Sequence, residues 1–457
     1  MTPADFLPEG LAAAVEAASG ARITAVRPRG GGGASRDGAE LDLAWPDNRT
    51  ASAYMNYDVH KAGAGDDAAF LRESAVLRAL SGPLASAGVR VAPYFASVPE
   101  QRALVCGLVT GDDSFGKLAD AQQRSALAKD FMSQLAALHR IDVAVTQVDG
   151  MGKIEPASGL IKRQIARLRS ANSGKEWDPL IHLSLDWLET NIPADMPDPV
   201  IVHGDAGPGN FLFEGDRVTA LLDWELVHYG DPMADLAMLC LRMLFQGFVP
   251  LPEAFSAYEE AGGYPVDLAR VRYWRLLFQT GFARRSRLHD PDAPPPPNLG
   301  MNLVYSTIHR RVLSEALADA AGVDLPPATL PEAPPSKYDR SYGIALDDIR
   351  DTILPRLSDQ QSAVKAKGMA RLIKWWRAIE RFGRVFDATE KSEIESALDQ
   401  GFANHSAAWS AFCDAVAEKR IESDRAIILC NAHEMREAAL MSDAMGSLAA
   451  TSFAPLE

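Results

Sequence analysis

The residues best suited to chemistry lie close together, between positions 203 and 225. This stretch opens with His203-Gly-Asp205, reaches Asn210 through a loop rich in Gly and Pro, and ends with Asp223-Trp-Glu. Carboxylate and amide oxygens are ligands that Mg²⁺ prefers, together with phosphate oxygens and water. The stretch therefore indicates a site for a divalent cation, provided that the chain brings these side chains together.

The elements around the loop should bring Asn210 and Asp223 together. Residues 199–202 are predicted to form a short buried strand, and residues 211–213 and 218–222 are predicted to form two strands of a tight hairpin. In an antiparallel hairpin, the residue that enters the first strand lies opposite the residue that leaves the second. We therefore expect a Mg²⁺ site at the open end of this hairpin.

The spacing from Asp205 to Asn210 is that of the kinase catalytic loop, H-R-D-x-x-x-x-N. In that loop the Asp accepts the proton of the substrate hydroxyl and the Asn holds a metal ion. With His203-Gly204 in place of His-Arg, and Asp223-Trp-Glu in place of Asp-Phe-Gly, the stretch resembles the aminoglycoside phosphotransferase-like family of small-molecule kinases. The alternative is that these are ordinary turn residues, but four of them fall at the required offsets.

The resemblance covers roughly residues 20–320 and implies an α+β, bilobal protein-kinase-like fold. It implies a sheet-rich N-lobe with one helix, a helical C-lobe, and ATP between them. Asp205 would orient and deprotonate an acceptor hydroxyl, while Asn210 and Asp223 would hold Mg²⁺ against the β- and γ-phosphates. ATP and Mg²⁺ are thus the expected nucleotide and cofactor.

A glycine-rich loop, residues 30–36, lies between the first two predicted strands. Such a loop can bring backbone N–H groups against phosphates because no side chain intervenes. Taken alone, four glycines are more often a flexible turn. The family's Gly-Gly-x-Ser pattern maps onto Gly32, Gly33 and Ser35, which the resemblance places over the nucleotide phosphates.

Glu73 lies in a predicted helix, 68–80, where kinases carry a glutamate that pairs with a strand lysine. Here the sequence departs from the family, because the equivalent strand end reads Tyr54-Met-Asn-Tyr57 and has no cation. Lys61, beyond the strand end, is the expected substitute. A solvated helix carboxylate is an equally good interpretation of Glu73.

The apolar run 103–109 resembles the family's last N-lobe strand and hinge. By this resemblance, backbone groups near Cys106 and Leu108 would bind the adenine edge. Three more residues should support the site. His139 is expected to be a packed structural histidine in a Leu-His-x-x-Asp signature, and Asp231 and Asp235 match the family's Gly-Asp-Pro and Asp-Leu-Ala positions. Asp235 is expected to cap the helix that follows it.

The order of elements predicts four segments along the chain. A proline-rich linker separates the kinase-like part from a last, purely helical part with no recognisable chemistry. The predicted segments are an N-lobe (1–111), a C-lobe with the catalytic loop (112–323), the linker (324–337) and a helical domain (338–457). Strands are expected at 21–27, 40–45 and 50–57, and C-terminal helices at 344–357, 364–386 and 390–398.

Composition argues against several classes of protein. A net charge of −15 and a pI near 5.1 argue against nucleic-acid binding, which needs clustered Lys and Arg. The first 20 residues lack the pattern of a signal peptide, and no uncharged apolar run approaches the roughly 18 residues of a membrane span. Four widely spaced cysteines suggest neither zinc nor disulfides. We expect a cytoplasmic protein without membrane or nucleic-acid partners, while its oligomeric state is left open.

The acceptor is expected to be a small hydroxylated metabolite and not an aminoglycoside. A polycationic drug needs a pocket lined by carboxylates, whereas the segments expected to line the acceptor cleft carry basic residues that would suit an anionic group. Kinase domains of this family that are linked to acyl-CoA metabolism prompt one specific candidate, a hydroxyacyl thioester. The basic residues are Lys162, Arg163, Arg167, Arg169, Arg284, Arg285 and Arg287.

Two other classes of function stay open. One is a catalytically silent nucleotide-binding protein, which the missing strand lysine favours and the intact base and metal residues oppose. The other is an interaction protein that works through its C-terminal helices, with the kinase fold as a scaffold.

Overall fold

The structure, a computed structural model of the 457-residue chain, describes residues 6–29, 36–58, 67–174, 177–283, 296 and 298–456. Packing divides the chain into two compact units. Unit 1 comprises Met1–Leu160, Asp195–Val271 and Pro455–Glu457, and unit 2 comprises Ile161–Ala194 and Arg272–Ala454. The domain boundaries predicted from the sequence stay predictions, because a packing unit need not fold alone.

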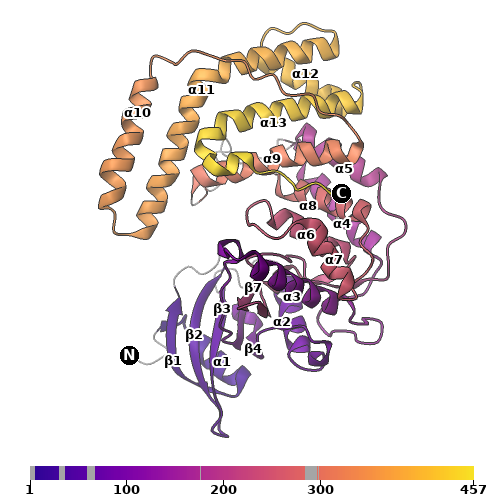
Figure 1. Ribbon diagram of the computed structural model, residues 1–457, viewed down its shortest axis with the longest axis vertical. Helices are drawn as coiled ribbons and strands as arrows, with labels where there is room; N and C mark the ends of the chain where they lie inside the picture. Colours follow the sequence, from indigo (N-terminus) through magenta and orange to yellow (C-terminus); the bar gives the residue numbers. More distant parts are fainter. Residues whose placement is uncertain are drawn as a thin grey trace. The chain divides into compact units, whose positions relative to one another are not determined.

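A five-stranded antiparallel sheet organises the first part of unit 1 (Figure 1). Its order is β1-β2-β3-β5-β4, so the first three strands form a meander, β5 lies next to β3, and β4 is at the edge. The three strands expected before residue 58 are present, whereas the short helix α1 and the strand β4 were not predicted. The bounds are α1 (Leu11–Ser19), β1 (Arg22–Arg29), β2 (Asp37–Ala44), β3 (Thr50–Tyr57), β4 (Tyr94–Val98) and β5 (Ala103–Gly107).

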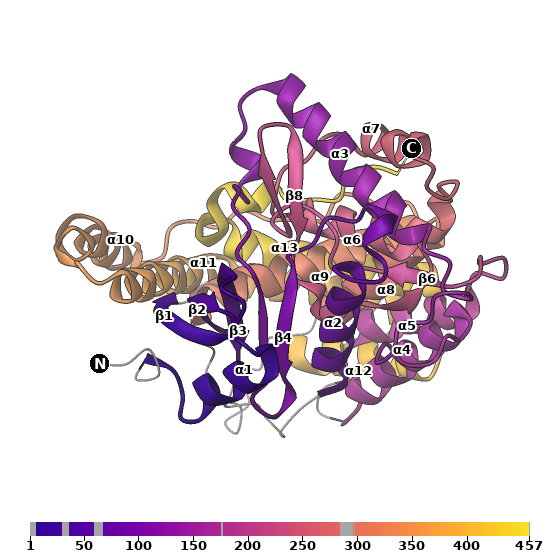
Figure 2. The same ribbon diagram turned by 90° about the horizontal axis from the view of Figure 1, so that it is seen from below.

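The two faces of this sheet differ, because successive side chains of a strand point to opposite sides. One face forms an apolar core with α1, which lies against the sheet in both ribbon views (Figure 2). The other face carries Tyr54 and Asn56 of β3, and Cys106 of β5 lies directly opposite Tyr54. Burial raises the pKa of Tyr54, and the charge of Asp223 raises it further. This second face is therefore directed toward the catalytic hairpin.

The remaining elements of unit 1 carry the candidate site. The predicted hairpin is confirmed as β7 paired with β8, and β6 pairs with β9. Helix α3 begins at an Asp120 cap and buries the apolar stripe that its sequence predicted. The bounds are α2 (Asp67–Leu80), α3 (Ala121–His139), β6 (Val200–Val202), β7 (Phe211–Glu214), β8 (Arg217–Leu221), η6 (Trp224–Leu226), β9 (His228–Gly230), α6 (Met233–Arg242) and α7 (Leu251–Glu260).

Unit 2 is helical in its described residues. The two helices predicted at 364–386 and 390–398 are one continuous helix, because no Gly or Pro interrupts the residues between them. The helix predicted at 344–357 was wrong in extent: α10 ends earlier, and a π-turn and a 3₁₀ turn that contains Pro355 follow. The bounds are α4 (Ala157–Ala171), α5 (Pro179–Thr190), α8 (Leu268–Phe282), α9 (Leu299–Ala321), α10 (Asp339–Asp347), α11 (Gln360–Leu398), α12 (His405–Ala417) and α13 (Ser423–Met445), where α4 and α8 begin in unit 1.

A buried arginine joins three elements of unit 2. Arg310 of α9 is 6% exposed, and its Nη2 lies 3.0 Å from Oδ2 of Asp178, the cap of α5. The same nitrogen lies 2.6 Å from Oε1 of Glu434 on α13, to which Nε also donates at 3.1 Å. Because a buried charge is costly unless it is paired, these contacts fix the three helices to one another.

A second buried network surrounds Glu390 of α11. Its carboxylate lies 2.6 Å from His405 Nε2, 2.9 Å from His433 Nδ1 and 3.4 Å from Arg436 Nη1. Burial alone would raise the pKa of Glu390, but the hydrogen bonds from the two histidines lower it. In return, Glu390 raises the pKa of His405.

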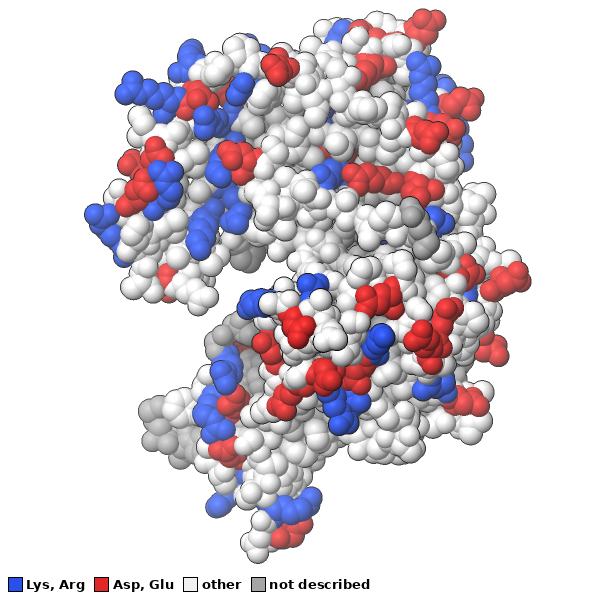
Figure 3. Space-filling model, in the orientation of Figure 1, with Lys and Arg blue, Asp and Glu red and all other residues white. Residues whose placement is uncertain are grey.

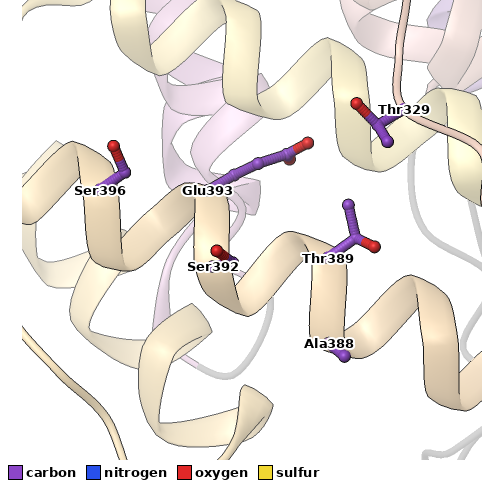
Figure 4. Close-up of a pocket in the computed structure, with 6 residues that line it drawn as sticks. All are labelled: Thr329, Ala388, Thr389, Ser392, Glu393 and Ser396. Atoms are coloured by element: carbon purple, nitrogen blue, oxygen red, sulfur yellow. The ribbon is translucent and has the colours of Figure 1, made fainter.

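The proline-rich segment is extended, as its composition predicted, but it is packed within unit 2. Arg381 Nε donates to the Ala333 carbonyl at 2.7 Å, and Arg436 Nε donates to the Thr329 carbonyl at 3.3 Å. Thr329 also lines a groove along α11 in which the other side chains are mostly hydroxyls (Figure 4). The carboxylate in that groove, Glu393, is already paired with Arg436.

Basic side chains gather over α10 and α11 on the face that Figure 3 displays. Lys367, Arg371 and Lys374 follow one another at helical spacing on α11 and line a hollow together with Arg350. Lys374 lies 3.4 Å from Asp443, and Arg350 pairs with aspartates of its own turn. Neighbouring carboxylates thus compensate part of this charge.

The sequence predicted neither a membrane-spanning helix nor disulfides. None of the helices in the described ranges is long and apolar enough to cross a membrane. The four cysteines all lie in those ranges, and none forms a disulfide.

Candidate active site

Asp205, the predicted base, is held from two sides in the loop that follows β6. Asn210 Nδ2 donates to Asp205 Oδ2 at 2.6 Å and to the Asp205 carbonyl at 2.8 Å. Arg242 Nη1 of α6 lies 2.8 Å from the same Oδ2. Both side-chain contacts use Oδ2, so Oδ1 is the oxygen that an acceptor hydroxyl can approach.

Sequence reasoning missed Arg242. The signal was its distance along α6 from Asp235, since residues seven apart lie on one face of a helix. Both side chains indeed reach the catalytic loop: Arg242 contacts Asp205, and Asp235 contacts the backbone before it. A cation beside the base is suited to the negative charge that develops in phosphoryl transfer.

Asp235 supports the loop in a way that its sequence context did not predict. Its carboxylate accepts the backbone N–H groups of His203 and Gly204, both at 2.8 Å, instead of capping its own helix. His139 Nε2 lies 3.0 Å from the same carboxylate, and His139 Nδ1 lies 2.7 Å from the Tyr258 hydroxyl. His139 is 1% exposed and Asp235 is fully buried, so this is a packed polar network below the site.

Asp231 provides the helix cap that Asp235 does not. Its Oδ1 accepts the Met233 N–H at 3.0 Å at the start of α6. The same oxygen lies 3.0 Å from Arg270 Nη1. Asp231 therefore fixes the start of the helix that carries Asp235 and Arg242.

His203 is a buried, neutral part of the loop. Burial lowers the pKa of its imidazole, and Nδ1 accepts the backbone N–H of Asp205 at 3.2 Å. Its ring packs on Trp224 with a centroid distance of 4.4 Å. The histidine thus orients the Asp205 backbone and packs the loop against the segment that follows Asp223.

Gly204 is required by its backbone. Its φ of +86° lies in the left-handed region, and a Cβ at this position would collide with the Leu226 carbonyl. The two loops of the site are therefore in direct backbone contact. This contact explains why a glycine stands where protein kinases carry arginine.

The hairpin brings Asn210 and Asp223 to the same end, as its register requires. Phe211 pairs with Leu221, and the Leu222 N–H donates to the Asn210 carbonyl at 2.9 Å. Asp223 is the next residue along the chain. The convergence that the sequence predicted is confirmed by this backbone pairing.

An ion pair anchors the hairpin to the rest of unit 1. Arg90 Nη2 donates to Asp130 Oδ1 of α3 at 3.1 Å, and Arg90 Nη1 donates to the Val218 carbonyl at 3.0 Å. Asp130 Oδ2 accepts the Val218 N–H at 2.8 Å. Strand β8 is thereby fixed before it reaches Asp223.

Asp223 has the features of a ligand for a cation. Its backbone is left-handed, with φ 57° and ψ 62°, which is unusual for a residue other than Gly. Its side chain is accessible, yet surrounding protein raises its pKa, and the nearby Asp205 carboxylate raises it further. A cation at this position would relieve the repulsion between the two carboxylates.

The oxygens present fit Mg²⁺. Asn210 uses its Nδ2 on Asp205, so its Oδ1 is the atom suited to a metal, together with the Asp223 carboxylate. Within the described ranges, no group of three or more His, Cys, Asp or Glu side chains is arranged to hold a metal. Such a group is not needed when phosphate oxygens and water complete the coordination.

Glu73 is not a solvated helix carboxylate. It is 4% exposed, and its Oε2 lies 2.7 Å from Nη1 of Arg36, a residue that sequence reasoning did not single out. Burial raises the pKa of Glu73 and the Arg36 guanidinium opposes that rise. Arg36 Nη2 also lies 3.6 Å from Glu225, two residues after Asp223. The helix glutamate therefore has a cationic partner, but the partner comes from the start of β2.

Several predicted nucleotide contacts lie outside the described residues, namely Gly32, Gly33, Ser35 and Lys61. Two others are described. Cys106 lies inside β5, between β3 and β4, and burial raises its pKa to about 12. Leu108 is 38% exposed, and its N–H already donates to the Ser52 carbonyl at 2.9 Å. An adenine contact by the Leu108 backbone would therefore need its carbonyl oxygen, and an apolar base could pack on its exposed side chain.

The basic residues expected near an acceptor are only partly described. Arg284, Arg285 and Arg287 lie outside the described residues. Arg169 Nη2 lies 2.9 Å from Asp186 and 2.7 Å from Glu189, both on α5. Arg169 is therefore committed to structural pairs and does not support an anionic acceptor.

The family of this site can be decided by comparison with known proteins. Residues 59–274 match the model of the phosphotransferase enzyme family. This segment belongs to that family. The matched range contains the catalytic loop, the hairpin and α6, so the resemblance inferred from the His-Gly-Asp and Asp-Trp-Glu stretches is confirmed.

A solved structure agrees with the phosphotransferase assignment at the level of the fold. A Ralstonia eutropha JMP134 protein assigned as an aminoglycoside phosphotransferase is similar to 68% of this chain over 98% of its own length. The TM-score is 0.52 at 22% sequence identity. The predicted kinase-like α+β fold is confirmed by this likeness.

The chain also resembles parts of larger proteins. It is 32% identical over 147 residues to acyl-CoA dehydrogenase family member 11 of Pongo abelii, covering 31% of this chain and 18% of that protein. It is 29% identical over 183 residues to the Arabidopsis thaliana protein named "Probable acyl-CoA dehydrogenase IBR3", covering 34% and 22%. The matches thus span only about a fifth of the length of these relatives.

Proposed function

We propose that this chain is an ATP- and Mg²⁺-dependent phosphotransferase that acts on a hydroxyl group of a small molecule. The observation that carries the proposal is the geometry around Asp205, whose Oδ2 is fixed by Asn210 and Arg242. This geometry supports Oδ1 as the oxygen that meets an acceptor, and the charges of Asp205 and Asp223 are close enough to interact.

The chemistry assigned to these residues is positioning and charge stabilisation. The acceptor hydroxyl oxygen attacks the γ-phosphorus of ATP, its proton passes to Asp205 Oδ1, and ADP leaves as the bond to the β-phosphate oxygen breaks. Arg242 stabilises negative charge beside the base. Mg²⁺, when bound by Asn210 Oδ1 and Asp223, would neutralise charge on the β- and γ-phosphates.

For the acceptor, we propose a small metabolite, with a hydroxyacyl thioester as the first candidate. The relatives named as acyl-CoA dehydrogenases support this choice. The basic-residue argument supports it less than the sequence suggested, because Arg169 is already paired. A cytoplasmic location is proposed with it.

The test is a screen for ATP consumption over hydroxyacyl thioesters, sugars, amino alcohols and aminoglycosides, with the Asp205→Asn variant as background. We expect turnover with a non-aminoglycoside hydroxyl compound and labelled phosphate on that compound. Efficient turnover of an aminoglycoside alone would overturn the acceptor class. Tight Mg-ATP binding without turnover on any acceptor would favour the silent nucleotide-binding protein.

A further inference from the structure

The face of β3 opposite the apolar core lacks the cation that nucleotide phosphates need. Tyr54 and Asn56 lie on this face, while the alternate residues Ala53, Met55 and Tyr57 belong to the core on the other face. In kinase-like sites, a lysine on this strand normally contacts the phosphates and is held by the helix glutamate. Any residue that replaces it must reach the same space from another element.

Arg36 reaches that space from the start of β2. In the β2–β3 ladder, Asp37 lies opposite Tyr57 and Gly38 lies opposite Asn56, so Arg36 precedes β2 beside the end of β3. Its side chain is 11% exposed and extends to Glu73 of α2, the helix glutamate. Its Nη2 lies 3.6 Å from Glu225, two residues after the predicted metal ligand Asp223.

The two carboxylate contacts of Arg36 are unequal. Glu73 is 5% exposed at its side chain and lies 2.7 Å from Nη1. Glu225 is 44% exposed and lies 3.6 Å from Nη2, beyond hydrogen-bond distance. A guanidinium has five N–H donors in a planar fork that matches phosphate oxygens. Glu73 can therefore hold one side of Arg36 while the side near Glu225 receives a phosphate.

We propose that Arg36 is the phosphate-binding cation of the nucleotide site and that Glu73 positions it, in place of a lysine on β3. This inference rests on the proposed function, since it concerns the same nucleotide. The anion that the geometry favours is a nucleoside polyphosphate, because Arg36 contacts the helix glutamate on one side and approaches Glu225, two residues after the predicted metal ligand Asp223, on the other.

The experiment measures Mg-ATP affinity by calorimetry for the wild type and three variants. Arg36→Met should weaken binding by about 10- to 100-fold, the effect of losing a charge-assisted contact, and Arg36→Lys should recover part of the loss. Arg36→Met alone leaves Glu73 buried without its cation and can destabilise the protein. The double variant Arg36→Met/Glu73→Met removes both charges and should fold, yet it should bind Mg-ATP as weakly as the single variant.

A matched control is Arg27→Met on β1. Arg27 pairs with Glu40 and Asp42 on the same sheet but is 46% exposed, so its loss should leave Mg-ATP affinity unchanged. Wild-type affinity in the folded double variant would overturn the role of Arg36, because a purely structural ion pair is replaceable by apolar residues. If the wild-type protein binds no Mg-ATP at all, the proposed function itself fails.

Discussion

Two arginines that pair with buried carboxylates, the partly buried Arg36 and the buried Arg310, show how differently the two units use charge. Arg310 lies within 3.0 Å of Asp178 and 2.6 Å of Glu434, and these side chains are 5% and 2% exposed. Arg36 has one such contact, with Glu73, while its second carboxylate, Glu225, is distant and accessible. Arg310 is saturated by the protein, whereas Arg36 keeps one side available.

The difference separates a structural network from a binding site. Around Arg310 and Glu390, every strongly buried charge meets its opposite inside unit 2, so those charges stabilise the helices. In the candidate site, Asp205 and Asp223 are neighbouring carboxylates whose charges disfavour each other. Such an arrangement is unfavourable unless a cation or a ligand completes it. Substitutions in the two regions should therefore affect different measurements.

The largest effect is expected for Asp205→Asn. The amide cannot accept the acceptor proton, so phosphoryl transfer should fall by about 10²- to 10⁴-fold. Mg-ATP affinity should stay within about twofold, because the carboxylate acts on the acceptor. A steady-state assay beside calorimetry checks both parts, and transfer at the wild-type rate would show that Asp205 is not the base.

Arg310→Met should have the opposite pattern. It leaves Asp178 and Glu434 buried without their cation, which should lower the free energy of unfolding by about 3–5 kcal/mol in a urea titration. Mg-ATP affinity of the folded protein should not change. The exposed pair Arg420–Glu418 supplies the control, since Arg420→Met should alter stability by less than about 1 kcal/mol. If Arg310→Met and Arg420→Met lowered the free energy of unfolding equally, Arg310 would not be the structural counterpart of Arg36.

A smaller effect is expected from comparing the two predicted metal ligands, Asp223 and Asn210, by their contribution to Mg²⁺-dependent ATP binding. Asp223→Ala should weaken Mg²⁺-dependent ATP binding on the order of tenfold more than Asn210→Ala, because a charged ligand holds the ion more strongly than an amide. Calorimetry with Mg-ATP, repeated with EDTA, isolates the metal-dependent part. An equal or reversed order would contradict the site drawn at the end of the hairpin.

The smallest expected effect is the dependence on pH of the stability that His405 and Glu390 contribute in unit 2. The pKa of His405 is raised in the folded protein, so its contribution is full below about pH 6.5 and is lost as pH rises through the folded value. The pKa of Glu390 is lowered, so its contribution is full above about pH 4.5 and is lost as pH falls through its folded value.

The advantage in Tm of the wild type over His405→Gln should therefore shrink by a few °C between pH 6 and pH 8.5, because only one of the two imidazoles titrates beside Glu390 in the variant. Histidines whose pKa burial lowers act in the opposite direction, but they are present in both proteins and cancel in this difference. His433 contributes in the same direction, since Glu390 raises its pKa against the opposing effect of burial. An identical pH profile for the variant and the wild type would mean that His405 does not titrate in this range.

The sequence predicted those features whose cause is local. The order of the β7–β8 hairpin follows from strand periodicity and a two-residue turn, so the convergence of Asn210 and Asp223 was predictable. The bulge that shifts the register between Leu212 and Phe213 was not predicted. Glu73 and its helix were also found. The partner of Glu73 was not, because Arg36 lies 37 positions earlier and reaches it only through the fold. Its position as the last residue of the glycine-rich loop was the available signal.

The contacts of Asp235, a polar residue at a helix end, were also not predictable, because they too form only through the fold. An aspartate in the first turn of a helix is normally a cap, and the sequence contains no sign that two backbone N–H groups of a distant loop would lie closer. Tertiary packing overrides the local preference here. The single continuous helix α11 shows the converse, since two apolar runs without a breaker between them formed one element.

The contact between Gly204 and the Leu226 carbonyl has a mechanical consequence. The loop that carries the base and the turn that follows the metal ligand touch backbone to backbone, with no side chain between them to deform. Neither loop can shift without displacing the other. The distance between Asp205 and Asp223 should therefore change little when nearby side chains move. Any redesign of the loop toward His-Arg-Asp would first have to separate these two backbones, and the alignment of base and metal would be lost in the same step.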